Sequence, residues 1–226
     1  MKPFLSAAPV TTPSPGMANE RDATSTLGGI LICGGQSRRM GRDKALLQVD
    51  GQSMIRRAAQ LLGETCSELQ LACGPEPRYS ELGLPLVLDA QADGGPLAGI
   101  CAGLKALQTS HGMVLACDMP RMQAVIVRRL FEAAEAEQLD VCYLATERGV
   151  EPLCAIYSQR CLPAIERALS LGVRKVTAFV QVEGLGTHLR VGQIALEQHA
   201  SDFTPVCNVN TPEDLARVQG QNGGPQ

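Results

Sequence analysis

A short apolar segment that stops at a pair of glycines constrains this chain more than any other stretch. Residues 30–33 read ILIC, and a glycine stands directly before and after them. An apolar run of this length, bounded in this way, is typical of a strand buried on both faces, and such strands belong to parallel sheets. We therefore expect an α/β fold with a mostly parallel sheet.

The loop after this expected strand has the composition of an anion-binding site. In open α/β sheets, ligands bind beyond the carboxyl ends of the strands, and glycine lets the backbone approach a ligand closely. Backbone N–H groups of a glycine-rich turn attract anions, to which arginine and lysine add positive charge. The loop offers Gly34, Gly35, Ser37, Arg38, Arg39, Arg42 and Lys44. From these residues alone, a tight turn followed by a solvated basic surface is the commoner explanation.

The spacing of the loop excludes two better-known phosphate loops. A Walker A loop has four residues between its glycines, and then lysine followed by serine or threonine. Here five residues separate Gly35 from Gly41, and Arg42 follows. The dinucleotide-binding pattern G-x-G-x-x-G is absent as well. A phosphate site at this loop would therefore be of a different kind.

Five motifs in one order resemble a group of nucleotidyltransferases. The loop GGQSRRMGRDK, which begins at Gly34, is similar to the G-G-x-S-x-R-M-G-x-D-K signature of the enzymes that activate sugars and cofactors. The likeness continues through GGPLAG, CDMP, EPLCAIY and NVNTPEDL, and it covers roughly residues 27 to 219. Within this superfamily, the chain most resembles the molybdenum cofactor guanylyltransferases.

This resemblance implies a fold, a reaction and partners. The implied fold is a three-layer α/β/α domain with a Rossmann-like, mostly parallel sheet of the nucleotide-diphospho-sugar transferase type. The implied reaction joins GMP from GTP to the terminal phosphate of molybdenum-bearing molybdopterin, with release of pyrophosphate. The implied partners are GTP, the molybdopterin cofactor and proteins that mature molybdoenzymes, and the implied ion is Mg²⁺.

The resemblance also assigns residues to the nucleotide. Ile32, Cys33 and Gly34 correspond to the backbone segment that meets the guanine nucleotide. Gly35 corresponds to a position beside the phosphates, and Asp89 to a nucleotide-contacting aspartate after the third strand. Cys33 stands where the family usually has alanine, and Ala72 or Cys73 stands where it has an asparagine. The second difference removes one expected nucleotide contact.

The loop and two further motifs supply the other expected catalytic and binding residues. Lys44 matches the phosphate-binding lysine, and we expect it to act with Arg38 in catalysis. Asp118 of CDMP matches the aspartate that binds magnesium. Its place after a buried strand suits a hard cation, although aspartate caps a turn just as often. Asn208 and Asn210 alternate along an extended segment, so one of them should face the site.

The same residues leave other functions open. The glycine pair resembles the guanylyl enzymes, whereas related cytidylyl enzymes usually have Ala-Gly here, so a cytidylyl or other sugar-type nucleotidyltransferase is the nearest alternative. A non-catalytic nucleotide-binding regulator is a second, against which the presence of both Lys44 and Asp118 argues. Nucleic acid is a distant third partner, because a net charge of −3 provides no general basic field.

Composition bears on the compartment and on metals. Nine cysteines occur singly, with an odd total and no C-x-x-C pair, which argues for a reducing cytoplasm and against a zinc site. No segment approaches the roughly 18 apolar residues of a membrane helix. The chain is therefore expected to be cytoplasmic, without a membrane or nucleic-acid partner.

Composition and periodicity also predict the organisation of the chain. Residues 1–26 are rich in Pro, Ser, Thr and Ala and are expected to be disordered, and the tail 220–226 is linker-like. One nucleotidyltransferase domain, 27–219, is expected between them. Strands are predicted at 69–73, 84–88, 113–116, 141–145 and 149–157, and near 206–210. Helices are predicted from Ser53 to a stop at Gly63, and at 96–107, 126–139, 159–171 and 174–182, with a capped start at Thr211.

Overall fold

A computed structural model describes residues 27–33, 43–89, 94–147, 149–195 and 208–220. The expected disordered segment 1–26 and the tail after residue 220 lie outside the described residues. Gly34, Gly35 and Arg38 of the glycine-rich loop lie outside them as well.

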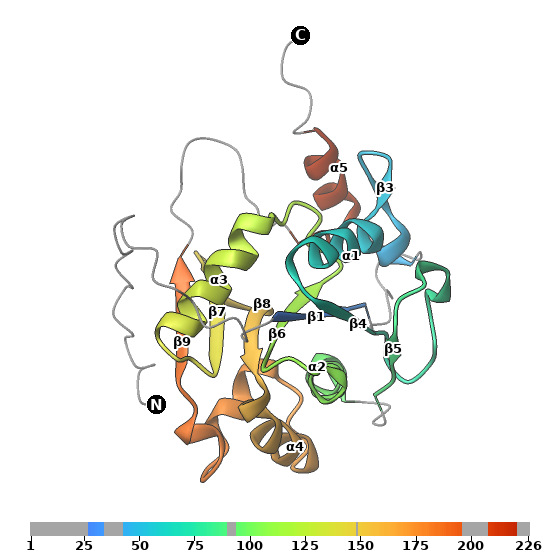
Figure 1. The fold of residues 1–226 in the computed structure, drawn as a ribbon. Helices are drawn as coiled ribbons and strands as arrows, with labels where there is room; N and C mark the ends of the chain where they lie inside the picture. Colours follow the sequence, from blue (N-terminus) through green and yellow to red (C-terminus); the bar gives the residue numbers. More distant parts are fainter. Residues whose placement is uncertain (1–26, 34–42, 90–93, 148, 196–207, 221–226) are drawn as a thin grey trace.

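A seven-stranded mixed sheet forms the middle of the molecule, in the order β5-β4-β1-β6-β8-β7-β9 (Figure 1). All neighbouring strands are parallel except β8, which runs antiparallel to β6 and β7. The strands are β1 Leu27–Ile32, β4 Glu68–Ala72, β5 Leu86–Val87, β6 His111–Ala116, β7 Val141–Thr146, β8 Gly149–Ser158 and β9 Val191–Ala195. The prediction of a mostly parallel sheet is confirmed.

Strand β1 contains Ile30, Leu31 and Ile32 of the apolar segment 30–33, but it begins earlier, at Leu27, and ends before Cys33. All six of its residues are buried, as expected for a strand covered on both faces. Its last residue, Ile32, lies beside Ala72 of β4 and Ala116 of β6 in the register of the sheet. The carboxyl ends of three neighbouring strands therefore meet at one level, where parallel α/β sheets place ligands.

Helices cover both faces of this sheet and complete three layers (Figure 1). Helices α1 (Met54–Thr65) and α3 (Ala124–Ala136) bury apolar residues in the core on one face. Helices α2 (Gly95–Ala106) and α4 (Leu162–Ser170), with the 3₁₀ turn η4 (Val176–Gln181), pack in the core on the other face. The expected α/β/α architecture is confirmed.

The C-terminal helix α5 (Pro212–Gly220) packs against a small hairpin of β2 (Gln48–Val49) and β3 (Gln52–Ser53). Their shared core consists of Val49, Met54, Val209 and Val218. The Arg121 guanidinium also donates a hydrogen bond to the carbonyl oxygen of Val218. These contacts hold the end of the chain beside the segment that follows the glycine-rich loop.

Several boundaries differ from the prediction. Helix α1 runs through Gly63 to Thr65, because nothing at Gly63 forces a left-handed turn, and Ser53 makes no side-chain cap bond. The predicted helix 159–171 divides into a 3₁₀ turn, η3 (Gln159–Cys161), and α4, which has proline in its first turn. The predicted helix 174–182 is η4 only, and residues 208–210 are not in a strand. Strand β9 and the β2–β3 hairpin were not predicted from the sequence.

Candidate active site

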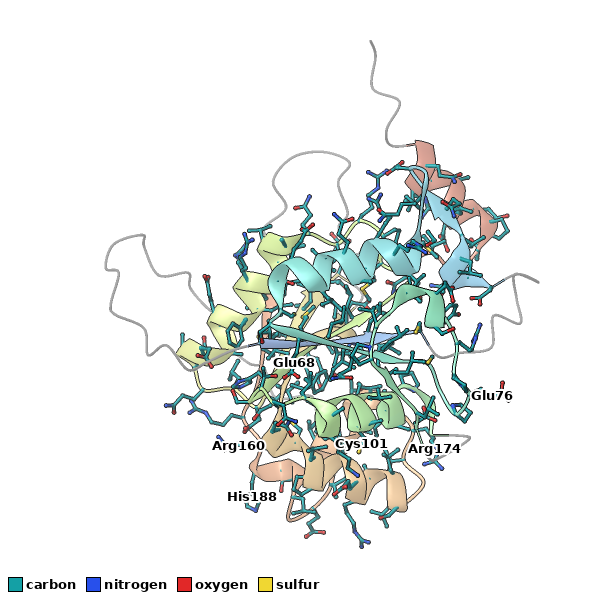
Figure 2. All side chains as sticks on the ribbon, turned by 45° about the vertical axis from the view of Figure 1, so that its right-hand side comes forward. Glu68, Glu76, Cys101, Arg160, Arg174 and His188 are labelled. Carbon is teal, nitrogen blue, oxygen red and sulfur yellow. The ribbon has the colours of Figure 1, made fainter. Side chains whose placement is uncertain are left out.

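The expected site lies at the carboxyl edge of the sheet, the side on which Figure 2 labels Glu76, just beyond β4. Lys44 begins a 3₁₀ turn, η1 (Lys44–Leu46), directly after the part of the loop that is not described. Asp43 caps this turn, because its Oδ1 accepts a hydrogen bond from the backbone N–H of Ala45 at 3.1 Å. The Ala45 side chain is buried in the core. The backbone of Lys44 is therefore fixed on both sides.

The side chain of Lys44 joins two of the predicted motifs. Its Nζ lies 2.7 Å from Oδ2 of Asp118, and it donates a hydrogen bond of 2.7 Å to Oδ1 of Asn210. The Lys44 and Asp118 side chains are 18% and 21% exposed, so both groups are accessible to a ligand. Residues separated by 74 and 166 positions thus meet at one ammonium group.

Asp118 and Asn210 are both held by backbone hydrogen bonds. Asp118 follows β6, and its carbonyl oxygen accepts a hydrogen bond of 3.0 Å from the N–H of Val209. The carboxylate of Asp214, in the first turn of α5, accepts the N–H groups of Asn210 and Thr211 at 3.0 Å each. The Thr211 hydroxyl accepts the N–H of Asp214 in return, which confirms the predicted capped start.

Two other predicted residues present buried oxygen atoms. Oδ1 of Asp89 and Oδ1 of Asn208 are buried, and neither accepts a hydrogen bond from the described part of the chain. Burial also raises the pKa of the Asp89 carboxyl above its ordinary value. Asp89 follows β5 and lines a hollow of about 600 Å³ together with residues of α2 and α4. Buried acceptors without donors are costly, and they are common where a ligand supplies the donor.

Three thiols lie in a row beneath this edge, at Cys33, Cys73 and Cys117, each the first residue after a neighbouring strand. Burial raises the pKa of the Cys33 and Cys117 thiols, and that of Cys117 reaches about 12. Cys33 donates to the carbonyl oxygen of Ala72 at 3.5 Å. Because a thiol reacts as its thiolate, Cys33 and Cys117 are suited to packing and not to nucleophilic attack.

The structure thus brings together Lys44, Asp118 and Asn210 from three predicted motifs. Ile32 is buried in β1, and Asp89 follows β5. Gly34, Gly35 and Arg38 are not described. Sequence reasoning missed Arg78 and Tyr79, which contact Asp43. The unassigned aspartate directly before Lys44 was the signal that could have drawn attention to them.

The oxygen atoms at this edge fit a magnesium ion of the kind that carries a nucleotide. Such an ion takes one or two carboxylates and completes its shell with water and phosphate oxygens. Asp118 supplies a carboxylate, with the amide oxygen of Asn210 close by. Across the described ranges, no three His, Cys, Asp or Glu side chains form a metal cluster, so an all-protein site of the zinc type is not found there. No helix of the described residues is long and apolar enough to cross a membrane.

The three-layer sheet carries a lysine and an aspartate at its carboxyl edge, and comparison with known proteins assigns the chain to a class of nucleotidyltransferases. The model of the MobA-like NTP transferase domain matches residues 29–187. The chain belongs to this family.

Relatives and solved structures agree with this assignment. The chain is 38% identical over 199 residues to a probable molybdenum cofactor guanylyltransferase of Pelotomaculum thermopropionicum, covering 86% of this chain and 93% of the relative. It is 32% identical over 195 residues to a molybdenum cofactor guanylyltransferase of Desulfosudis oleivorans, covering 84% and 93%. The fold is similar to that of molybdopterin-guanine dinucleotide biosynthesis protein A from Archaeoglobus fulgidus, with a TM-score of 0.71, 22% identity and coverage of 87% and 98%.

Proposed function

We propose that this protein transfers GMP from GTP to the terminal phosphate of molybdenum-bearing molybdopterin, which yields a guanine dinucleotide cofactor and pyrophosphate. The observation that carries the proposal is the meeting of Lys44, Asp118 and Asn210 at the carboxyl edge of the sheet. The chain's relatives named molybdenum cofactor guanylyltransferase support the choice of nucleotide and acceptor.

The chemistry requires positioning and charge more than a protein nucleophile. An acceptor phosphate oxygen attacks the α-phosphorus of GTP in line, the new O–P bond forms, and the bond to the pyrophosphate oxygen breaks. Both reactants are anions, so the enzyme must reduce their repulsion and align them. Lys44 would stabilise negative charge on the triphosphate, together with Arg38 of the loop. Asn210 fixes the Lys44 ammonium at 2.7 Å.

Asp118 is the residue that would hold Mg²⁺ with GTP. A bound magnesium ion would supply charge neutralisation at the phosphates, as in other phosphoryl transfers. Asp89 and Asn208 would accept hydrogen bonds from the nucleotide or the acceptor, because each has a buried oxygen for which the described chain provides no donor. Ile32, Cys33, Gly34 and Gly35 would form the backbone edge beside the nucleotide.

The same proposal includes a compartment and partners. We place the reaction in the cytoplasm, with GTP and molybdopterin as substrates and with proteins of molybdoenzyme maturation as further partners. The free thiols of all described cysteines suit a reducing compartment.

One incubation tests the function directly. Purified protein is mixed with molybdenum-loaded molybdopterin, Mg²⁺ and each of the four NTPs in turn, and the products are identified by mass spectrometry. The expected product is the guanine dinucleotide, together with pyrophosphate. A cytosine dinucleotide would instead support the cytidylyl alternative. Nucleotide binding without any release of pyrophosphate would support a non-catalytic regulator.

A further inference from the structure

Asp43 is a carboxylate beside the proposed site to which the proposed reaction gives no role. Besides the N–H of Ala45, it accepts hydrogen bonds from the Tyr79 hydroxyl at 2.9 Å to Oδ1 and 2.8 Å to Oδ2. The Arg78 guanidinium lies 2.5 Å from its Oδ2. Both partners belong to the segment that follows β4, more than 30 positions away. We call Asp43, Arg78 and Tyr79 the Asp43 cluster.

Tyr79 holds its place in this cluster against a backbone cost. Its φ is +61°, in the left-handed region that non-glycine residues rarely adopt, while the residue is only 7% exposed. Such strained residues persist only where the surrounding structure holds them, and they gather at functional sites. Here, burial of the Tyr79 ring and its hydrogen bonds to Asp43 hold the residue in this conformation. Burial and the Asp43 hydrogen bond raise the pKa of the Tyr79 hydroxyl, so it remains a donor at neutral pH.

The charges of the Asp43 cluster suit a residue beside a phosphate site. A lone carboxylate next to Lys44 would repel a triphosphate and compete for the ammonium. Arg78 supplies a compensating positive charge at 2.5 Å, stacked 4.8 Å from the centre of the Tyr79 ring. Asp43 can therefore cap the turn that carries Lys44 without leaving an unbalanced negative charge near the phosphates.

We propose that Asp43, held by Arg78 and Tyr79, is a positioning residue that fixes the direction of the Lys44 ammonium. It does so through the η1 turn, whose first residue is Lys44 and whose cap is the Asp43 carboxylate. The same contacts connect Lys44 to the segment after β4, beside the end of β1 where the nucleotide is expected. The catalytic part of this inference rests on the proposed transfer reaction, whereas the structural link between Tyr79 and Lys44 does not.

The first test compares two tyrosine-to-phenylalanine variants in steady-state kinetics. Tyr79→Phe keeps the buried ring and removes the hydroxyl, and Tyr143→Phe makes the same change at a buried tyrosine of β7 outside the cluster. We expect Tyr79→Phe to lower kcat about tenfold, as for a misaligned group, while KM for GTP changes by less than about threefold. Tyr143→Phe should leave both parameters unchanged. Equal kinetics in wild type and Tyr79→Phe would overturn the positioning role.

A combined variant separates positioning from general stabilisation. If Asp43 and Tyr79 act as one unit, then Asp43→Ala with Tyr79→Phe should be no slower than Asp43→Ala alone, because alanine has no acceptor for the Tyr79 hydroxyl and the second change removes an interaction already lost. If the two substitutions acted independently, their fold-reductions in kcat would instead multiply. Multiplicative effects on kcat would contradict the proposed unit.

The second test needs no turnover. The chain contains the lysines Lys2, Lys44, Lys105 and Lys175, so ¹⁵N NMR of the side-chain ammonium groups gives few signals. The Lys44 signal, identified by its loss in Lys44→Ala, should exchange slowly with water in the nucleotide-free protein, because Asp118 and Asn210 hold the group. We expect this signal to broaden or disappear in Tyr79→Phe and to persist in Tyr143→Phe. An unchanged Lys44 signal in Tyr79→Phe would refute the inference. Failure of wild-type transfer, by contrast, would refute only the proposed function.

Discussion

Lys44 is the residue on which we expect the proposed transfer to depend most, because its ammonium group would stabilise the charge that grows as the bond to the α-phosphorus breaks. We expect Lys44→Ala to reduce turnover by about 10²-fold or more, comparable to about 3 kcal/mol for one preorganised donor. GTP binding should weaken less. Steady-state kinetics with GTP varied at saturating acceptor measures both parameters.

The matched variant Lys44→Arg keeps the charge. It should restore only part of the activity, because a planar guanidinium cannot reproduce the compact ammonium that contacts Asp118 and Asn210 at 2.7 Å each. An unchanged turnover number in Lys44→Ala would mean that the lysine is an ordinary solvated side chain.

Asp118 should be needed for transfer and not for folding. Asp118→Asn keeps the size of the side chain and loses the charge that would hold magnesium. We expect transfer to be abolished, with weak GTP binding retained and a normal circular dichroism spectrum. Titration with Mn²⁺, followed by its electron paramagnetic resonance signal in the presence of GTP, should show weaker metal binding than in wild type. Near-normal turnover at ordinary magnesium concentrations would exclude Asp118 as a metal ligand.

At the residue scale, the sequence could identify chemistry but not contacts. Motifs predicted a phosphate-binding role for Lys44 and a metal-binding role for Asp118, which stay predictions, and the structure places the two side chains 2.7 Å apart. It also shows that Asn210, of the two asparagines, contacts Lys44. That choice depends on the α5 cap formed by Asp214, which no alternation pattern contains. The Asp43 cluster was not predicted, because it requires a tyrosine in a left-handed conformation.

At the scale of elements, the packing of α2 on β1 leaves no room for an extra methyl group. A Cβ added at Gly103 would lie 2.5 Å from Cγ2 of Ile30, a fully buried side chain of β1. Alanine favours a helix over glycine by about 1 kcal/mol, but overpacking a dense core costs about 1–3 kcal/mol. We therefore expect Gly103→Ala to lower the free energy of unfolding, as measured by urea denaturation.

Gly63→Ala in α1 provides the control for this prediction. A Cβ at Gly63 would meet nothing within 4 Å, so the helical preference of alanine acts alone there. This variant should be more stable than wild type by up to about 1 kcal/mol. Equal gains in both variants would show that α2 can shift away from β1.

Element boundaries were predicted least well where tertiary contacts decide them. Gly63 was expected to end α1, yet the helix continues because its apolar face still packs on the core as far as Leu62 and the glycine costs little in the last turn. Strand β9 was missed since only Ile194 of its five residues is buried, which leaves almost no apolar pattern. By contrast, β1 and β6 were predictable from continuous apolar runs.

At the scale of the whole molecule, the α/β/α architecture was predictable because strands and helices alternate along the first half of the chain with short connections. The rule that parallel strands present ligands at their carboxyl ends predicts where the site lies, and the structure brings Lys44 and Asp118 together at that edge. The antiparallel insertion of β8 between β6 and β7 was not predictable, because the apolar run of β8 carries no sign of its direction.

Ligand binding should stabilise the whole fold, and the size of this effect should depend on the base. A ligand that binds only the folded state at 100 times its Kd adds about 2.7 kcal/mol, which corresponds to an increase in Tm of roughly 5–10 °C for a chain of this size. The buried Oδ1 of Asp89 can accept hydrogen bonds from the N–H groups of guanine, and a site built for such bonds rejects a base that cannot make them. We expect GTP with Mg²⁺ to raise Tm by roughly 5–10 °C and CTP with Mg²⁺ to raise it much less. EDTA should reduce the Tm increase caused by GTP. Differential scanning calorimetry at equal nucleotide concentrations measures all three effects. If Asp89 contacts the base, Asp89→Ala should make the Tm shifts with GTP and CTP more nearly equal. Equal Tm shifts in the wild-type protein would contradict guanine selectivity. A larger Tm shift with CTP than with GTP would favour a cytidylyltransferase.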